Sequence, residues 1–231
     1  MRVLALDAAT EGCSVALLSG REVIGRMTEL PRTQVEQILA MVDEVLAEAQ
    51  VSLSMLDGIA ASVGPGAFTG VRISVAVAQG LAFGAGLRVV PVTTLEALAL
   101  QAVQGGAANA LACLDARMGE VYWGCFAADR ERGLVASCTA RVGPPGTVVL
   151  PDAGIYRGIG RGFAAYPMLV ALPGVELDPK DSQALPNARE FATLGALRLG
   201  LGEGLDPADL SPLYLRDKVA LTEAERRQQK A

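Results

Sequence analysis

The sequence contains no histidine among its 231 residues. That absence excludes Ser-His-Asp triads, Cys-His dyads, H-E-x-x-H zinc sites and every histidine-ligated metal. The four cysteines, at positions 13, 113, 125 and 138, form no C-x-x-C pair, so reduced buried thiols are expected instead of a zinc site. Composition leaves open only a metal held by carboxylates. No nucleophile-plus-base pair presents itself, and we predict no catalytic residue and no metal ligand.

Long uninterrupted apolar runs are also lacking. The stretch from Ser62 to Gly84 comes closest to a membrane span, but Arg72 and Gln79 interrupt it and its glycines are frequent. These interruptions favour a buried helix of a soluble protein. The N-terminal apolar run is too short for a signal peptide and is broken by Asp7. We therefore expect a cytoplasmic protein with no membrane partner.

An excess of positive charge is missing as well, since the formal net charge is −5 and the pI is near 4.9. A protein that grips nucleic acid alone usually presents a basic surface, because phosphate neutralisation supplies most of its affinity. The balance argues against autonomous RNA binding, although Arg26, Arg32, Arg157 and Arg161 could form a local patch. Because 51% of the residues are hydrophobic, a sizeable core is expected in one large domain or two small ones.

The first hundred residues predict the element order β-β-β-α-β-α-β-α. A three-stranded meander leads into an amphipathic helix over Thr33–Ala49, whose apolar residues fill one face. A buried strand then ends in the glycine turn "GPG", and a second helix is expected from about Gly70 to Gly84, capped by Thr69 or Gly70. The third helix, "TTLEALALQAVQ", opens with a threonine N-cap and has Glu96 in its first turn.

The second half of the chain repeats this pattern in a shorter form. The strands "ANALACLDAR", "GEVYWGCFAAD" and "GLVASCTARV" come first, but the next segment is too short and proline-rich for a full helix. A strand with a glycine turn, a short helix and the clear helix "NAREFATLGALRLGLG" follow. We therefore predict an α/β chain of two β-β-β-α-β-α units with the second trimmed, divided near "VQGGAAN" into residues 1–104 and 105–231.

Each unit opens with a strand that ends in an aspartate, followed by a turn and a returning strand. The backbone N–H groups of such a hairpin can cradle a phosphate and the aspartate can hold Mg²⁺, which makes Asp7, Thr10 and Asp115 candidate ligand-binding residues. The alternative is that these side chains satisfy backbone groups of their turns. Ala8 and Ala9 weaken the first interpretation, because their Cβ atoms crowd the approach to a phosphate.

The stretch "GPGAFTGVR" also supports two interpretations. It can be an anion site at a helix N-terminus, or a tight corner in which Gly64 and Gly66 supply unusual φ angles. A P-loop is excluded, because no G-K-[S/T] follows. We favour the corner.

The helix after this corner is apolar on two sides. One side, with Val71, Val75, Ala78 and Ala82, suits a sheet, and Arg72 and Gln79 occupy a flank. The other side carries the small-residue stripe Ala76–Gly80–Gly84, which lets another helix approach closely. The Thr33–Ala49 helix could cover this stripe, but its single apolar face already packs on a sheet. We therefore favour a second subunit.

Four stretches, "MRVLALDAATEGCSVALL", "GPGAFTGVRISVAVAQGLA", "LDARMGEVYW" and "PLYLRDKVA", together resemble the TsaB (YeaZ) family. The resemblance covers nearly the whole chain and is weakest from about Pro144 to Arg189. It implies an actin-like (ASKHA, RNase H-like) fold of two subdomains. It also implies a role in forming N6-threonylcarbamoyladenosine on tRNAs that read codons beginning with A.

In that family the chemistry belongs to a paralogue, TsaD, which carries a histidine-ligated metal. The resemblance implies that this chain is a non-catalytic scaffold that pairs with TsaD, that the complex recruits the ATPase TsaE, and that the chain forms homodimers when alone. It implies contact with tRNA only through the complex and no cofactor of its own, although ATP or ADP with Mg²⁺ could bind at the complex interface. The implied interface comprises Gln34, Gln37, Met41, Arg72, Ile73, Ala76, Val77, Gly80 and Gly84.

One departure from the family lies at Gln34, where members often have a histidine. Only partner binding carries over to this position. Two other functions stay open on the residues alone. The two aspartate hairpins fit an independent ATP-binding kinase or ATPase of the actin-like superfamily, and a peptidase is a weaker third possibility.

Overall fold

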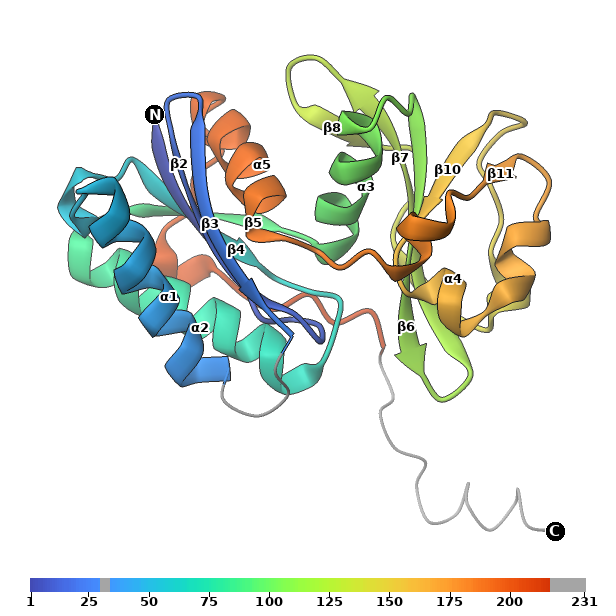
Figure 1. Cartoon of the computed structure of the whole chain (residues 1–231), viewed down its shortest axis with the longest axis horizontal. Helices are drawn as coiled ribbons and strands as arrows, with labels where there is room; N and C mark the ends of the chain where they lie inside the picture. Colours follow the sequence, from blue (N-terminus) through green and yellow to red (C-terminus); the bar gives the residue numbers. More distant parts are fainter. Residues whose placement is uncertain (30–33, 217–231) are drawn as a thin grey trace, which may run out of the picture.

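The computed structural model describes residues 1–29 and 34–216, with the backbone only of residues 34–36. Its first lobe is built on a five-stranded sheet in the order β3-β2-β1-β4-β5 (Figure 1). The central strand is buried along nearly its whole length, as its apolar run predicts for a strand covered on both faces. The first three strands form the predicted antiparallel meander, and β4 and β5 run parallel to β1. The strands are β1 (Arg2–Asp7), β2 (Cys13–Ser19), β3 (Glu22–Thr28), β4 (Gly58–Ser62) and β5 (Arg88–Val92).

The second lobe repeats this topology in the order β8-β7-β6-β10-β11, which again places the third, second, first, fourth and fifth strands side by side. The repeat confirms the predicted actin-like fold of two related units. The third strand of this unit was predicted as one element, but it runs as two short strands that both pair with β7. The strands are β6 (Asn109–Arg117), β7 (Glu120–Asp129), β8 (Gly133–Ala136), β9 (Arg141–Gly143), β10 (Tyr156–Ile159) and β11 (Val175–Glu176).

The helices are distributed unequally over the two sheets. The outer face of the first sheet is covered by α1 (Gln34–Ala49) and α2 (Phe68–Ala85), which lie side by side (Figure 1). Among the residues that the structure describes, the second sheet has only α4 (Gly162–Ala165) and short 3₁₀ turns on its outer side, so the second unit is trimmed as predicted. By length and composition, α2 is the one helix in the described part of the chain that could cross a membrane. One side of α2, however, packs on the first sheet.

The last helix of each unit packs on the sheet of the other unit. Helix α3 (Thr94–Gln104) follows the first unit but contacts β6 and β7, whereas α5 (Ala188–Gly200) follows the second unit but contacts β1, β2 and β4. Both helices lie between the sheets (Figure 1), where they form one shared apolar core. The predicted capping box of α3 is present, with Thr93 and Glu96 bonded reciprocally. The division into residues 1–104 and 105–231 stays a prediction, because neither segment contains all the helices that cover its sheet.

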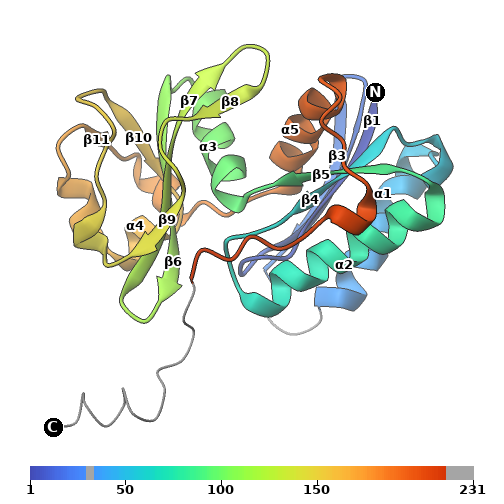
Figure 2. The ribbon, with the colours of Figure 1, turned by 180° about the vertical axis from the view of Figure 1, so that it is seen from behind.

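Residues 201–216, here called the C-terminal strap, run along α2 toward the second lobe (Figure 2). The Gln79 side-chain amide donates to the carbonyl oxygens of Pro207 at 2.9 Å and Leu210 at 3.0 Å. Farther on, Arg216 donates to the Ala116 carbonyl at 3.1 Å and pairs with Glu120. The strap therefore joins the helix layer of the first lobe to the β6–β7 hairpin of the second.

Candidate functional site

The glycine corner before α2 packs directly against the β1–β2 hairpin. The Ala67 N–H donates to the Ala9 carbonyl at 2.7 Å, and a Cβ atom at Gly66 or Gly70 would collide with the carbonyl oxygens of Ala9 and Ala8. Only Gly64, at φ +90°, needs a glycine for its φ angle. Gly66 and Gly70 are therefore required because there is no room for a side chain at either position. The expectation of an unusual φ angle at Gly66 was wrong.

The start of α2 also differs from the prediction. The helix begins at Phe68 after an Ala67 N-cap that makes no side-chain hydrogen bond, so the predicted caps at Thr69 and Gly70 were wrong. The physical reason is the close packing just described, because Gly70 already lies in the first turn, pressed against Ala8. A helix start is therefore fixed here by tertiary contact with the hairpin instead of by a capping side chain.

In the hairpin between β1 and β2, two backbone N–H groups donate to side chains of the same chain. The Ala9 N–H donates to the Asp7 carboxylate at 3.0 Å, and the Ala8 N–H donates to the Ser74 hydroxyl on α2 at 2.8 Å. Asp7 is fully buried, and desolvation raises its pKa to about 6, against the opposing effects of the Ser62 hydroxyl and the Ala9 amide. The N–H groups of Ala8 and Ala9 are therefore already used and cannot hold a phosphate, and Mg²⁺ has no access to the Asp7 carboxylate, which has no solvent contact. The residues of this hairpin therefore do not fit a nucleotide phosphate with its metal.

The second hairpin holds its turn in a similar way. Asp115 accepts the Arg117 N–H at 2.8 Å and the Tyr166 hydroxyl at 3.2 Å. The Arg117 guanidinium then pairs with Asp115 and, across the gap between the lobes, with Glu11, both at 2.9 Å. Both predicted aspartates thus accept the amide two residues farther on, which is the turn role weighed in the sequence analysis. Thr10 is nearly buried at the first turn.

A cleft of about 640 Å³ lies between the two hairpins. Its cationic side chains are engaged within the chain, since Arg117 pairs with Glu11, Arg161 with Glu29 at 2.9 Å, and Arg216 with Glu120. The chain has no histidine, so none can serve as a base beside the cleft. These ion pairs connect the two lobes.

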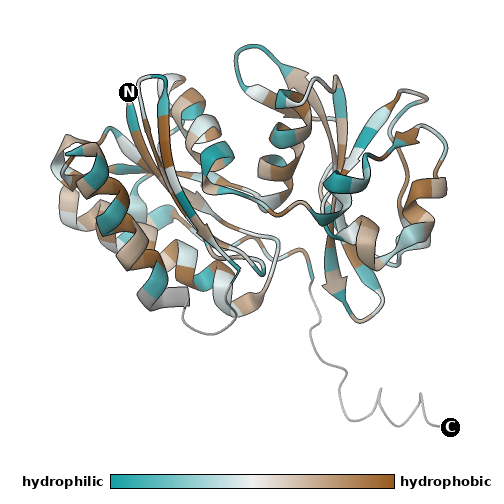
Figure 3. Ribbon diagram, viewed as in Figure 1, coloured by the Kyte–Doolittle hydropathy of each residue, from teal (hydrophilic) through white to brown (hydrophobic). Residues whose placement is uncertain are grey.

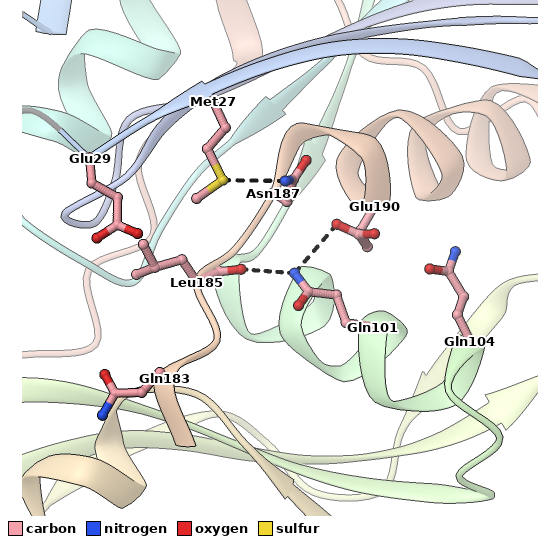
Figure 4. Close-up of a pocket in the computed structure, with 8 residues that line it drawn as sticks. All are labelled: Met27, Glu29, Gln101, Gln104, Gln183, Leu185, Asn187 and Glu190. Carbon is pink, nitrogen blue, oxygen red and sulfur yellow. Dashed lines mark hydrogen bonds between the residues drawn. The ribbon is translucent and has the colours of Figure 1, made fainter. Parts of the chain in front are cut away.

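A smaller hollow of about 360 Å³ shares Glu29 with this cleft as a lining residue (Figure 4). Gln101 donates to the Leu185 carbonyl at 2.8 Å and to Glu190 at 3.4 Å. Burial raises the pKa of Glu190 to about 7, although the hydrogen bonds from its own amide and from Gln101 and the charge of Arg189 act to lower it. The sequence did not point to this hollow, because its walls come from β3, α3 and the segment before α5. Within residues 1–29 and 34–216, no group of three or more acidic or cysteine side chains could hold a metal ion.

The outer side of α2 is open. Ala76, Gly80 and Gly84 are exposed, and a Cβ atom at either glycine would meet nothing within 4 Å. Phe68 and Arg72 continue the same line toward the start of the helix at a spacing of four residues, which places all five on one ridge. We call these five residues the α2 ridge: Phe68, Arg72, Ala76, Gly80 and Gly84. Beside its far end, Phe83 is 77% exposed, and apolar colouring continues along this helix (Figure 3).

The remaining residues of the predicted interface are less open. Ile73, Val77 and Met41 are half-buried and pack against the core between α1, α2 and the sheet. Met41 is therefore less exposed than predicted, and its central place in the interface stays a prediction. Gln37 is half-buried, whereas the side chain of Gln34 and the predicted start at Thr33 lie outside the described residues.

Two aromatic residues that sequence reasoning missed surround Arg72. Its guanidinium carbon lies 3.7 Å from the centroid of the Phe68 ring, and its Nε donates to the Tyr214 hydroxyl at 2.9 Å. The two rings are stacked with centroids 5.8 Å apart. The four-residue spacing of Phe68 and Arg72 is a signal that could have been read. Tyr214 belongs to the strap, 142 residues farther along, and no local pattern connects it to Arg72.

Comparison with known proteins gives a consistent result. A family model described as TsaD, tRNA N6-adenosine threonylcarbamoyltransferase, matches residues 28–136. The tRNA threonylcarbamoyladenosine biosynthesis protein TsaB of Escherichia coli is 37% identical over 95% of this chain and 96% of its own length. The protein of the same name from Haemophilus influenzae is 35% identical over 95% of both chains.

Solved structures agree with these relatives. YeaZ from Pseudomonas aeruginosa is 39% identical, covers 93% of this chain and 99% of its own, and superposes with a TM-score of 0.85. A second Pseudomonas aeruginosa structure, described as an uncharacterized protein with similarity to peptidase YeaZ, covers the same shares with a TM-score of 0.86. The chain therefore belongs to the TsaB (YeaZ) family of tRNA threonylcarbamoyladenosine biosynthesis proteins.

Proposed function

We propose that this chain is a non-catalytic partner subunit in the formation of N6-threonylcarbamoyladenosine on tRNA, and that it pairs with a TsaD-type catalytic subunit through the α2 ridge. The observation that carries the proposal is the open ridge itself. Its centre consists of Ala76 and Gly80, and a partner helix can approach the α2 backbone there more closely than anywhere else along the outer side. An exposed apolar strip of this kind is typical of a protein interface.

The family match supports the choice of partner. The TsaD model covers residues 28–136, a segment that includes both α1 and α2. A TsaD-type subunit would therefore present a helix pair of the same design, and two such pairs can pack face to face as a four-helix layer. The same surface would join two copies of this chain when the partner is absent.

The hairpin geometry supports a subunit without its own chemistry. Ala8 and Ala9 donate their N–H groups within the chain, Asp7 is buried, and the chain lacks a histidine base. We further propose that tRNA and a TsaE-type ATPase engage the assembled complex in the cytoplasm. The net charge of −5 and the pairing of the cleft arginines with glutamates give this chain little basic surface for tRNA.

Replacement of Gly80 by leucine tests the pairing. The new side chain fills the space that a partner helix would need, so co-purification with the TsaD-type subunit of the same organism should be lost while the monomer stays folded. Gly200→Leu is the matched control, because Gly200 is also an exposed helical glycine whose Cβ would meet only the end of Met1, at 4.0 Å. Complex formation by Gly80→Leu at the level of the control would contradict the proposal.

Calorimetry with Mg-ATP separates this proposal from an independent ATPase. We expect no micromolar binding and no turnover by the isolated chain. Micromolar binding with turnover, both lost on Asp7→Ala, would instead support the ATPase. A peptidase would require hydrolysis of a peptide by the purified chain.

A further inference from the structure

We propose that Arg72 recognises a carboxylate on an apolar helix of the partner subunit, and that Phe68 and Tyr214 hold the guanidinium ready for it. This inference rests on the proposed function, because it names the chemistry that the α2 ridge requires of its partner. It concerns the N-terminal end of the ridge, beside Tyr214, whereas the Gly80 experiment concerns the centre of the ridge.

The guanidinium of Arg72 is already held in place. One face lies 3.7 Å from the Phe68 ring centroid, and the Nε edge donates to the Tyr214 hydroxyl at 2.9 Å. Tyr214 is itself anchored by the strap, since the neighbouring Leu213 N–H donates to the Val63 carbonyl at 2.8 Å. Immobilising a flexible side chain before binding reduces the entropy lost on association. Arginine enclosed by aromatic rings is also a frequent composition of interface hot spots.

Arg72 lacks an acidic partner in the part of the chain that the structure describes. The arginines at the inter-lobe cleft, Arg117, Arg161 and Arg216, each pair with a glutamate. Arg72 makes no ion pair with any described residue, and its two terminal nitrogens make no described hydrogen bond. Its guanidinium edge is therefore available for the two parallel hydrogen bonds that arginine makes with a carboxylate.

The neighbours of Arg72 decide what kind of anion it meets. Ala76 lies one turn farther along the ridge and Gly80 one turn beyond that, so a helix seated on them removes water from beside Arg72. A charge in such a place is costly unless it is paired, and the partner must therefore supply the opposite charge. The apolar strip suits a protein helix instead of a sugar-phosphate backbone, and a net charge of −5 disfavours a polyanion.

The test measures the affinity of the full chain for the TsaD-type subunit at several salt concentrations. Arg72→Ala should weaken binding about 10- to 100-fold and flatten its salt dependence, and Arg72→Glu should weaken it more. Arg72→Lys should recover only part of the affinity, because an ammonium cannot bond in two parallel directions. Tyr214→Phe, which keeps the ring and removes the hydroxyl, should give a smaller loss. Arg130→Ala is the control, on an exposed turn of the other lobe.

The partner's carboxylate is found by charge exchange. Arginine is placed in turn at each acidic position of the partner's facing helices, and one of these variants should restore binding to Arg72→Glu. Restoration by none of them would overturn the proposal. The proposal would also be overturned if Arg72→Ala and Arg72→Glu bind with unchanged affinity while Gly80→Leu abolishes the complex. In that case the α2 ridge would still be the docking surface. If Gly80→Leu leaves the complex intact, the proposed function itself fails. If Arg72→Ala weakens only the binding of tRNA, Arg72 contacts nucleic acid, and the proposal that it recognises a carboxylate is overturned.

Discussion

On the inner side of α2, Gly70 lies against the Ala8 carbonyl and Ser74 accepts the Ala8 N–H, so small side chains make room for the chain's own hairpin. On the outer side, Gly80 and Gly84 border open space, and a side chain added at either would touch nothing. Glycine thus serves two purposes at positions ten and fourteen residues apart on one helix. The two purposes differ because the inner glycine has a neighbour from the same chain and the outer glycines do not. Replacing a glycine on each side by alanine tests this difference.

Gly70→Ala should have the largest effect. Its Cβ atom would collide with the Ala8 backbone, which cannot move without displacing β1, and the free energy of unfolding should fall by about 3 kcal/mol or more. Urea unfolding followed by circular dichroism measures this loss. Gly84→Ala is the control on the open side and should not destabilise the fold. A loss below about 1 kcal/mol for Gly70→Ala would show that the inner packing yields more easily than packed interiors usually do.

A smaller effect is expected at Asp7, which lies beneath the start of α2. Because burial raises its pKa from 3.8 to about 6, the folded state binds this proton more tightly than the unfolded state does. The stabilisation that the protonated Asp7 gives the folded state is therefore complete below about pH 4 and is lost as the pH rises through 6. Asp7→Asn should be more stable than the parent by about 2–3 kcal/mol at pH 8 and nearly equal to it at pH 3.5.

Unfolding free energies measured from pH 3.5 to 8 check this prediction. Glu190, whose pKa is raised to about 7, should cause a second loss of stability as the pH rises, and Asp7→Asn should retain that part. Glu190→Gln is the matched control, since it should remove the Glu190 part alone. A difference in stability between Asp7→Asn and the parent that stays constant from pH 3.5 to 8 would contradict the raised pKa of Asp7, and a constant difference for Glu190→Gln would contradict that of Glu190.

Local patterns in the sequence were sufficient to predict most of the fold. The meander, the amphipathic α1 and the capping box of Thr93 and Glu96 depend on neighbours within a few residues, and the structure contains all three. The exchange of α3 and α5 between the sheets could not be predicted in this way. Helix α3 packs on the two strands that directly follow it, whereas α5 packs on β1, β2 and β4, more than 120 positions earlier in the chain. No local pattern in the sequence indicates that α5 returns to the first sheet.

The candidate site was likewise predictable only where it depends on local patterns in the sequence. Periodicity was enough to place Ala76, Gly80 and Gly84 on one side of a helix, and the structure leaves that side exposed. Periodicity could not show that Met41 is half-buried, because that depends on the packing of α1 beside α2 and on the sheet. Nor could it bring Tyr214 to Arg72, since the strap makes that contact and the two residues are 142 positions apart.

Gly80→Ala gives the smallest expected change in stability, and its sign is opposite to that of Gly70→Ala. Glycine inside a helix is less favourable than alanine by about 0.5–1 kcal/mol, and the new methyl group meets no atom of the chain. The isolated protein should therefore become slightly more stable, which thermal unfolding can detect. Its affinity for the TsaD-type subunit should fall, because the methyl group widens the narrowest point of the ridge. A gain in stability together with a loss of binding would mean that this glycine serves the partner and not the fold, whereas a gain in stability with unchanged binding would place the contact elsewhere on the helix.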